Sequence, residues 1–151
     1  MSKQYLDKDG LQVAVDNVKE AKEIAAGAMA LAQQAMDNVG PTNYSTTEQF
    51  TGKYWIDGKK IYRKYTVTGT LPNNTRKSVP HNVSNLNRVI GITGMAYDSN
   101  GNQITLPFNN IDVNGTVVVW VKNDDIVILT TNDLTAYTES FVIIEYTKTT
   151  N

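Results

Sequence analysis

Cysteine is absent from this 151-residue chain, and histidine and proline are scarce, with one and four copies. Without thiols the chain forms no disulfide and offers no thiolate ligand to a metal ion. No apolar run approaches the roughly 20 residues that a membrane-spanning helix requires. The formal net charge is −1, so charge alone does not attract the chain to nucleic acid or to an anionic membrane. We therefore expect neither nucleic acid nor a membrane among its partners.

The N-terminal sequence also lacks the features of a secretion signal. Met1-Ser2-Lys3-Gln4 does not show the charged and then apolar layout of a signal peptide. This predicts synthesis and folding in a cytosol and leaves the final location open. The composition, 40% hydrophobic and 19% charged, fits a folded protein with one or two small domains.

The most regular pattern in the chain lies between Leu11 and Val39, where apolar residues recur every 3.5 residues on average. These residues form the predicted seam: Leu11, Val15, Val18, Lys22, Ala25, Met29, Ala32, Met36 and Val39. Only Lys22 interrupts its apolar character. This period is typical of a left-handed coiled coil. An alanine-rich stripe beside the seam makes the apolar face wider than two strands require, so we predict a trimeric coiled-coil helix over residues 11–40.

Local signals bound this helix on both sides. Asp7 or Asp9 is expected to cap its N-terminus, because a carboxylate accepts hydrogen bonds from the amides of the first turn. Val39-Gly40-Pro41 forms a stop signal, with glycine at the end of the helix and proline just beyond it. Residues 1–10 are predicted to be a separate polar segment.

From Tyr44 onward the chain is rich in Val, Ile, Thr and Tyr, with short turn signals between the apolar stretches. Three hairpins are predicted, around turns at Asp57-Gly58, Asp98–Asn102 and Lys122–Asp125. The Asp-Gly pair suits a type I′ turn. Residues 41–151 are therefore predicted to form an antiparallel β-sandwich of the jelly-roll type. The fold class is α+β by segment, a coiled-coil helix followed by a β domain.

The sequence shows little sign of catalysis. His81 has no recognisable partner base or nucleophile, so we expect a loop or strand-edge histidine with local hydrogen bonds. The acidic residues fall mostly at predicted turns, and the Asp98–Asn102 run lacks the distal glutamate of a calcium loop. A hydrolase of surface polysaccharide would need paired carboxylates in a cleft. We therefore predict no enzyme activity, no cofactor and no metal.

Aromatic residues are concentrated in the predicted β domain. Most of them are expected in its core, because a small sandwich needs its large side chains inside. Exposed tyrosines stack on sugars or take part in protein interfaces. The candidates for such surface recognition are Tyr54, Tyr62, Tyr65 and Tyr137.

Two stretches resemble the C-terminal β domain of bacteriophage virion fibre proteins, which include short head fibres and tail fibres. They are Tyr44–Glu48 with Gly52–Lys64, and Val79–Ile90 around Val79-Pro80-His81-Asn82-Val83. The opening Tyr5–Leu11 is similar to the start of many phage structural proteins. The resemblance implies a homotrimer in the virion, with the N-terminus docked on a capsid or tail protein through Tyr5 and Leu6. It implies no catalytic residues.

Two functions follow from this reading. The first is a trimeric structural fibre whose helices form the shaft. The second is a host-attachment module in which the β domain recognises a host-surface glycan or protein receptor, with weak contacts multiplied by three linked sites.

Overall fold

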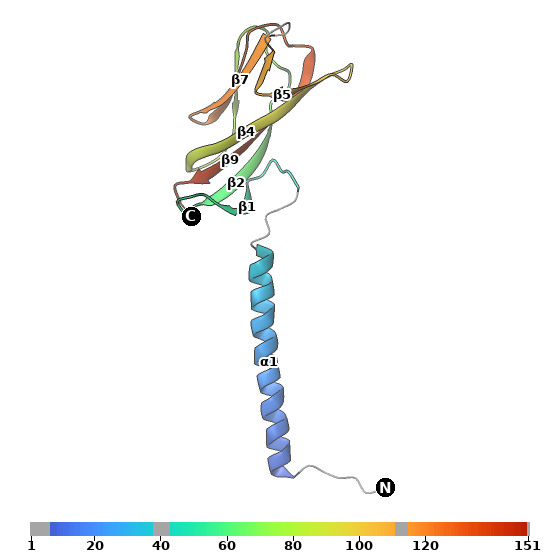
Figure 1. The fold of residues 1–151 in the computed structure, drawn as a ribbon, viewed down its shortest axis with the longest axis vertical. Helices are drawn as coiled ribbons and strands as arrows, with labels where there is room; N and C mark the ends of the chain where they lie inside the picture. The colour runs from blue at the N-terminus through green and yellow to red at the C-terminus, as the bar shows by residue number, and fades with distance from the viewer. Residues whose placement is uncertain (1–6, 38–42, 111–114, 151) are drawn as a thin grey trace. The chain divides into compact units, whose positions relative to one another are not determined.

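The computed structural model describes residues 7–37, 43–110 and 115–150. In that part of the chain one α-helix precedes nine β-strands (Figure 1). Their bounds are α1 (Lys8–Asp37), β1 (Gln49–Tyr54), β2 (Lys60–Val67), β3 (Arg76–Pro80), β4 (Leu86–Asp98), β5 (Gln103–Leu106), β6 (Phe108–Asn110), β7 (Gly115–Lys122), β8 (Asp125–Thr130) and β9 (Tyr137–Lys148). The α+β class is thus confirmed. The chain divides into two compact units between residues 39 and 40, and each is described by itself.

Helix α1 begins earlier than the heptad pattern suggested. The Asp7 carboxylate accepts a hydrogen bond from the backbone N–H of Gly10 at 2.8 Å, so Asp7 is the N-cap. Asp9 lies in the first turn, where its negative charge suits the positive end of the helix dipole. Lys8–Gly10, assigned from the sequence to the polar N-terminal segment, are therefore helical. No helix in the described part of the chain is long and apolar enough to cross a membrane.

The strands form two antiparallel sheets. The first has five strands in the order β1-β2-β9-β4-β5 (Figure 1). The second has four strands in the order β3-β8-β7-β6. The two longest strands, β4 and β9, pair along most of their length inside the first sheet. The chain changes sheet between β2 and β3, between β3 and β4, between β5 and β6, and between β8 and β9. These crossings join both sheets into one unit.

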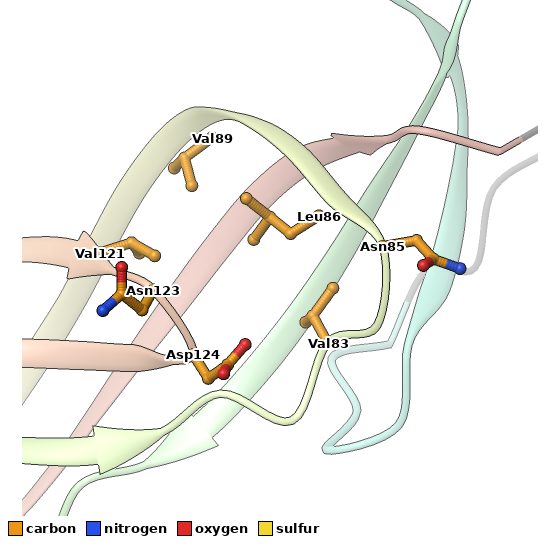
Figure 2. Close-up of a pocket in the computed structure, with 7 residues that line it drawn as sticks. All are labelled: Val83, Asn85, Leu86, Val89, Val121, Asn123 and Asp124. Carbon is orange, nitrogen blue, oxygen red and sulfur yellow. The ribbon is translucent and has the colours of Figure 1, made fainter.

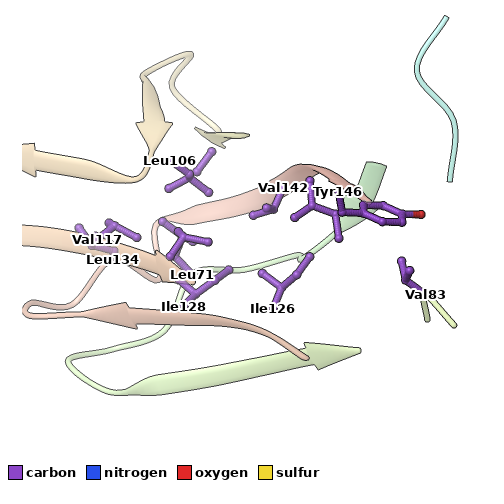
Figure 3. Close-up of a cluster of buried hydrophobic side chains, with 12 residues drawn as sticks. Leu71, Val83, Leu106, Val117, Ile126, Ile128, Leu134, Val142 and Tyr146 are labelled. Carbon is purple, nitrogen blue, oxygen red and sulfur yellow. The ribbon is translucent and has the colours of Figure 1, made fainter. Parts of the chain in front are cut away.

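The core of the β domain takes side chains from both sheets. Val142, Ile144 and Tyr146 of β9 alternate along the strand and are fully buried. Ile126 and Ile128 of β8, in the other sheet, belong to the same cluster (Figure 3). Two sheets that share one core pack face to face, as in a sandwich.

The three predicted hairpins are present as β1–β2, β4–β5 and β7–β8. The prediction of a type I′ turn at Asp57-Gly58 is wrong, because the hairpin loop contains three residues, Ile56, Asp57 and Gly58, and not two. The N–H of Gly58 donates to the carbonyl of Trp55 at 2.9 Å, and Gly58 has a φ of +79°. Asp57 keeps a negative φ, and its carboxylate accepts a hydrogen bond from the backbone N–H of Lys59. A type I turn followed by a left-handed glycine is the usual geometry of a three-residue hairpin loop.

Candidate functional site and assembly surfaces

The predicted seam of helix α1 is exposed in the single chain. Leu11, Val15, Val18 and Met29 have 58%, 53%, 55% and 75% of their surface accessible. Lys22, Ala25 and Ala32 are exposed as well. The side chain of Met36 and the whole of Val39 lie outside the described residues, as do Tyr5 and Leu6 of the N-terminal segment. Burying one Val, Leu or Met side chain contributes roughly 1.5–3 kcal/mol, so association of such helices has a substantial driving force.

The apolar face of α1 extends beyond that seam. Ile24 and Leu31 are 66% and 69% exposed and lie outside it. With Ala28 and Ala35 they form a second stripe spaced 4-3-4, again a heptad rhythm. The separation of seven residues between Ile24 and Leu31 was visible in the sequence but was missed. An apolar face of this width exceeds what one partner helix covers.

A pocket of about 510 Å³ lies where the β3–β4 loop and the β7–β8 turn meet β4 (Figure 2). We call it the end pocket. Its apolar lining consists of Val83, Leu86, Val89 and Val121. Its polar lining consists of Asn85, Asn123 and Asp124. Ligand sites commonly combine an apolar wall with a few polar groups in a cavity of this size.

The buried His81 holds the loops beside the end pocket together. Its ring is 1% exposed, Nδ1 accepts a hydrogen bond from the N–H of Val83, and Nε2 donates to the carbonyl of Asn123, both at 3.0 Å. Because a backbone N–H only donates, Nδ1 carries no proton and the ring is neutral. The backbone N–H of His81 also donates to the carbonyl of Asp124 at 2.9 Å. The bond to Val83 is local, as expected from the sequence, whereas the bond to Asn123 joins residues far apart in the chain and the ring lies in the interior.

Asparagines fix the backbone around the same pocket. Asn82, Asn85 and Asn123 have positive φ angles of 49°, 57° and 54°. Asparagine adopts this left-handed conformation more readily than most residues. The carbonyl of Asn85 also accepts the backbone N–H of Thr149 at 2.8 Å. The polar residues that line the end pocket therefore lie on loops whose backbone conformation is well defined.

A second cavity, of about 360 Å³, lies on the outer face of the five-stranded sheet. We call it the aromatic groove. The rings of Tyr65 and Phe141 stack with centroids 4.7 Å apart, and those of Phe141 and Tyr97 with centroids 6.3 Å apart. Val67 and Glu139 also line the groove. Three strands, β2, β9 and β4, thus contribute one row of nearly parallel rings.

The structure does not bring the four candidate tyrosines together. Tyr65 lies in the aromatic groove, and Tyr54 is 53% exposed on β1. Tyr62 and Tyr137 are half-buried and pack against the core, because the inner face of the sheet needs large side chains there. Tyr54 and Tyr62 both contact Phe50, at centroid distances of 5.6 and 6.1 Å.

Sequence reasoning missed the role of Phe141 and Tyr97 as groove residues. The signal was the alternation in β9, which places Phe141 on the face opposite to Val142.

Glu48 ties the start of the β domain to its last strand. Its carboxylate accepts hydrogen bonds from the Tyr146 hydroxyl at 2.6 Å and from Lys148 Nζ at 2.8 Å. Burial raises the pKa of the Tyr146 hydroxyl well above its usual value, and the bond to Glu48 raises it further. This hydroxyl is held in its neutral, donating form, which suits a structural tie.

The turn aspartates use their carboxylates to hold loops. The side-chain amide of Asn102 lowers the pKa of Asp98, and backbone N–H groups of Asn100 and Asn102 act in the same direction. Bonds from Lys59 and from Thr135 likewise lower the pKa values of Asp57 and Asp133. Among the described residues no group of three or more His, Asp or Glu side chains is placed to hold a metal ion.

Comparison with protein-family models, with curated proteins and with solved structures found no match.

Proposed function

We propose that this protein is a homotrimeric structural fibre protein of a bacteriophage virion, in a head or tail fibre. Its helices form a coiled-coil shaft, and each chain displays a jelly-roll-like β domain. The N-terminal segment, with Tyr5 and Leu6, binds a capsid or tail protein. The proposal needs no cofactor and no catalytic step.

The observation that carries this proposal is the exposed seam of α1. A helix with this many exposed apolar side chains at heptad spacing gains stability mainly by packing against other helices. The β domain has its own core of side chains from both sheets. Copies of the same helix are the simplest partner, since identical seams pack with identical register. The wide apolar face and the small alanines favour three copies over two.

Sedimentation equilibrium of the full chain tests the assembly. The expected mass is three times the 16.7 kDa of one chain at micromolar concentration. A monomer under these conditions overturns the proposal. Immunogold labelling of particles with an antibody to the chain tests the virion location, and the expected result is label on a fibre.

A second function, recognition of the host surface, is supported by the end pocket. Asparagine and aspartate side chains beside an apolar wall suit the hydroxyl groups and the apolar face of a sugar ring. Weak binding at each pocket would be multiplied by the three linked copies.

A glycan array with the full chain tests this second function. The Asp124→Ala variant is expected to lose the bound signal, because Asp124 lines the end pocket. Asp125→Ala, one residue later at the start of β8, is the matched control and should retain it. Absence of binding to any host glycan or host cell leaves the structural role alone.

A further inference from the structure

The outer face of the five-stranded sheet is unusually apolar for a surface. We define the apolar sheet face as five outward side chains of β2, β4 and β9, of which Val67 is exposed and the others are half-buried: Tyr65, Val67, Met95, Tyr97 and Phe141. Ile143 of β9 points to the same side but is only 7% exposed. The strand register places Tyr65 opposite Ile143, and Phe141 between Val67 and Met95. In an antiparallel sandwich the outer face normally carries polar residues in alternation with the core. Along this part of β9, apolar residues occupy both faces.

Polar residues surround this apolar centre. Next to the pair Tyr65 and Ile143, the following outward pair along β2 and β9 is Arg63 and Glu145. At the other end of the face, Glu139 lies opposite Tyr97. Gln103 and Thr105 of β5 pair with β4 at the neighbouring edge. Val67 is 60% exposed. A patch with an aromatic and Met-containing centre and a polar rim has the anatomy of a protein–protein interface.

The contents of the face favour a protein over a sugar. A sugar site needs polar groups directed at the ligand from the centre as well as from the rim. Here the centre of the face also carries the non-aromatic apolar side chains of Val67 and Met95. Such a surface gains more from packing against another apolar surface.

The chain itself supplies that partner. The backbone N–H of Tyr65 donates to the carbonyl of Ser45 at 2.9 Å, and the guanidinium of Arg63 lies 4.5 Å from the centroid of the Tyr44 ring. The segment that follows the helix is therefore fixed on β2, at the margin of the apolar sheet face. Only residues 38–43 separate it from the end of α1. Chains joined through their helices would thus hold three copies of this face at high local concentration.

We infer that the apolar sheet face packs against the β domains of the other copies of this chain, as a second assembly surface besides the helix seam. This inference rests on the proposed homotrimer. It adds a role for the aromatic groove, which would be filled by neighbouring chains. In a closed cyclic assembly each copy repeats the same contacts, so all three faces are covered alike.

Thiol labelling of single-cysteine variants tests the inference. The native chain contains no cysteine, so each variant carries one thiol per chain. Val67→Cys places it in the apolar sheet face, and Val118→Cys is the matched control on the other sheet, where the native valine is 41% exposed. Each is labelled with a maleimide in the full chain and again in a form made monomeric by Val18→Asp.

The thiol of the Val67→Cys variant is expected to react at least roughly tenfold more slowly in the trimer than in the monomeric form, because labelling then requires local opening. The control thiol should react equally in both. Equal reactivity of the Val67→Cys thiol in the monomeric form and in a sample with trimer mass overturns the inference, leaves the homotrimer intact and frees the groove for a foreign ligand. A native chain of monomer mass overturns the homotrimer and this inference together.

As a second measurement, Val67→Glu should lower the thermal stability of the β domain in the trimer and leave the monomeric form unchanged. Val118→Glu should change the thermal stability of the β domain equally in the trimer and in the monomeric form. Equal effects of Val67→Glu in trimer and monomer also overturn the inference.

Discussion

The apolar side chains of the helix and those of the β domain differ in how much of their surface is exposed. In the β domain Ile126, Ile128 and Ile144 are fully buried. In α1 the seam residues Val15 and Val18 are more than half exposed in the single chain. The β domain therefore contains the partners of its own core, whereas the apolar seam of α1 is left exposed.

The two regions also differ in how far apart their contacting residues are in sequence. Hydrogen bonds within α1 are local, as in any helix. The β domain is closed by distant pairs such as Glu48 with Tyr146 and Thr68 with Ser140. If α1 packs against other chains, as we propose, its stability should depend on protein concentration. The stability of the β domain should depend much less on protein concentration.

The largest expected effect comes from a charge in the seam. In the proposed trimer, Val18→Asp would place an unpaired carboxylate in each helix, at a cost of about 3–5 kcal/mol for each buried charge. The trimer should dissociate at micromolar concentration, and the helical circular-dichroism signal should fall. Sedimentation equilibrium and circular dichroism measure the two effects.

Val13→Asp is the matched control, because Val13 is 59% exposed and lies outside the seam. It should leave the trimer intact. Dissociation by both variants to the same degree would mean that the seam has been assigned to the wrong face.

A substitution in the core of the β domain should have the opposite effect, because it should destabilise that domain and leave the assembly of α1 intact. Ile128→Ala should lower the free energy of unfolding of this domain by about 2–5 kcal/mol, since Ile128 is fully buried in the shared core. Urea unfolding followed by tryptophan fluorescence measures the change. The seam should still assemble, so light scattering should report an unchanged mass in the absence of urea.

Val118→Ala, at a position 41% exposed on the neighbouring strand, should cost less than about 1 kcal/mol. A similar loss from both variants would contradict the view that the core carries the stability of this domain.

Local patterns in the sequence predicted the helix and the hairpins because both depend on residues close together in the chain. The heptad rhythm predicted α1, and the turn residues at Asp57-Gly58 and Asp98–Asn102 predicted two of the turns. The type I′ assignment failed because a dipeptide does not show that the loop includes a third residue, Ile56.

Long-range pairing could not be read from such patterns. Nothing local in β2 indicates that its neighbour is β9, and that pairing decides which tyrosines are buried. Tyr62 is half-buried because it lies opposite Tyr146, whereas Tyr65, opposite Ile143, lies on the outer face. The end pocket was missed for the same reason, since its lining comes from a loop, a turn and two strands distant in sequence.

Two glycines of β4, Gly91 and Gly94, differ in the space that a side chain would find beside β9. A Cβ added at Gly94 would overlap the carbonyl group of Phe141 on β9, which belongs to the backbone and has little room to move. Gly94→Ala should therefore destabilise the β domain by roughly 1–3 kcal/mol or more, as overpacking does. Thermal unfolding of the β domain measures the change.

Gly91→Ala, three residues away on the same strand, would meet only the Cβ of Glu145 at 3.9 Å and should be tolerated. Neither substitution should alter the assembly of α1. Equal tolerance of both alanines would show that β4 and β9 are less closely paired than described.

The smallest expected effect concerns the hydroxyl of Tyr146. Tyr146→Phe removes the hydrogen bond to Glu48 and should cost about 1 kcal/mol at neutral pH. Since the pKa of this hydroxyl is raised in the folded chain, the folded state keeps a proton that the unfolded state releases above about pH 10. The stabilisation by Tyr146 is therefore fully present below about pH 10 and is lost as the pH rises further.

The free-energy difference between wild type and Tyr146→Phe should thus shrink between roughly pH 10 and 11, the range just above the ordinary tyrosine pKa. Urea titrations of both proteins across this range measure it. Tyr54→Phe, at an exposed position on β1, controls for loss of a hydroxyl and should differ from wild type by less than about 0.5 kcal/mol at neutral pH. A Tyr146→Phe difference that stays constant up to about pH 11 would mean that the buried hydroxyl does not hold its proton, and that Glu48 is tied to β9 mainly through Lys148.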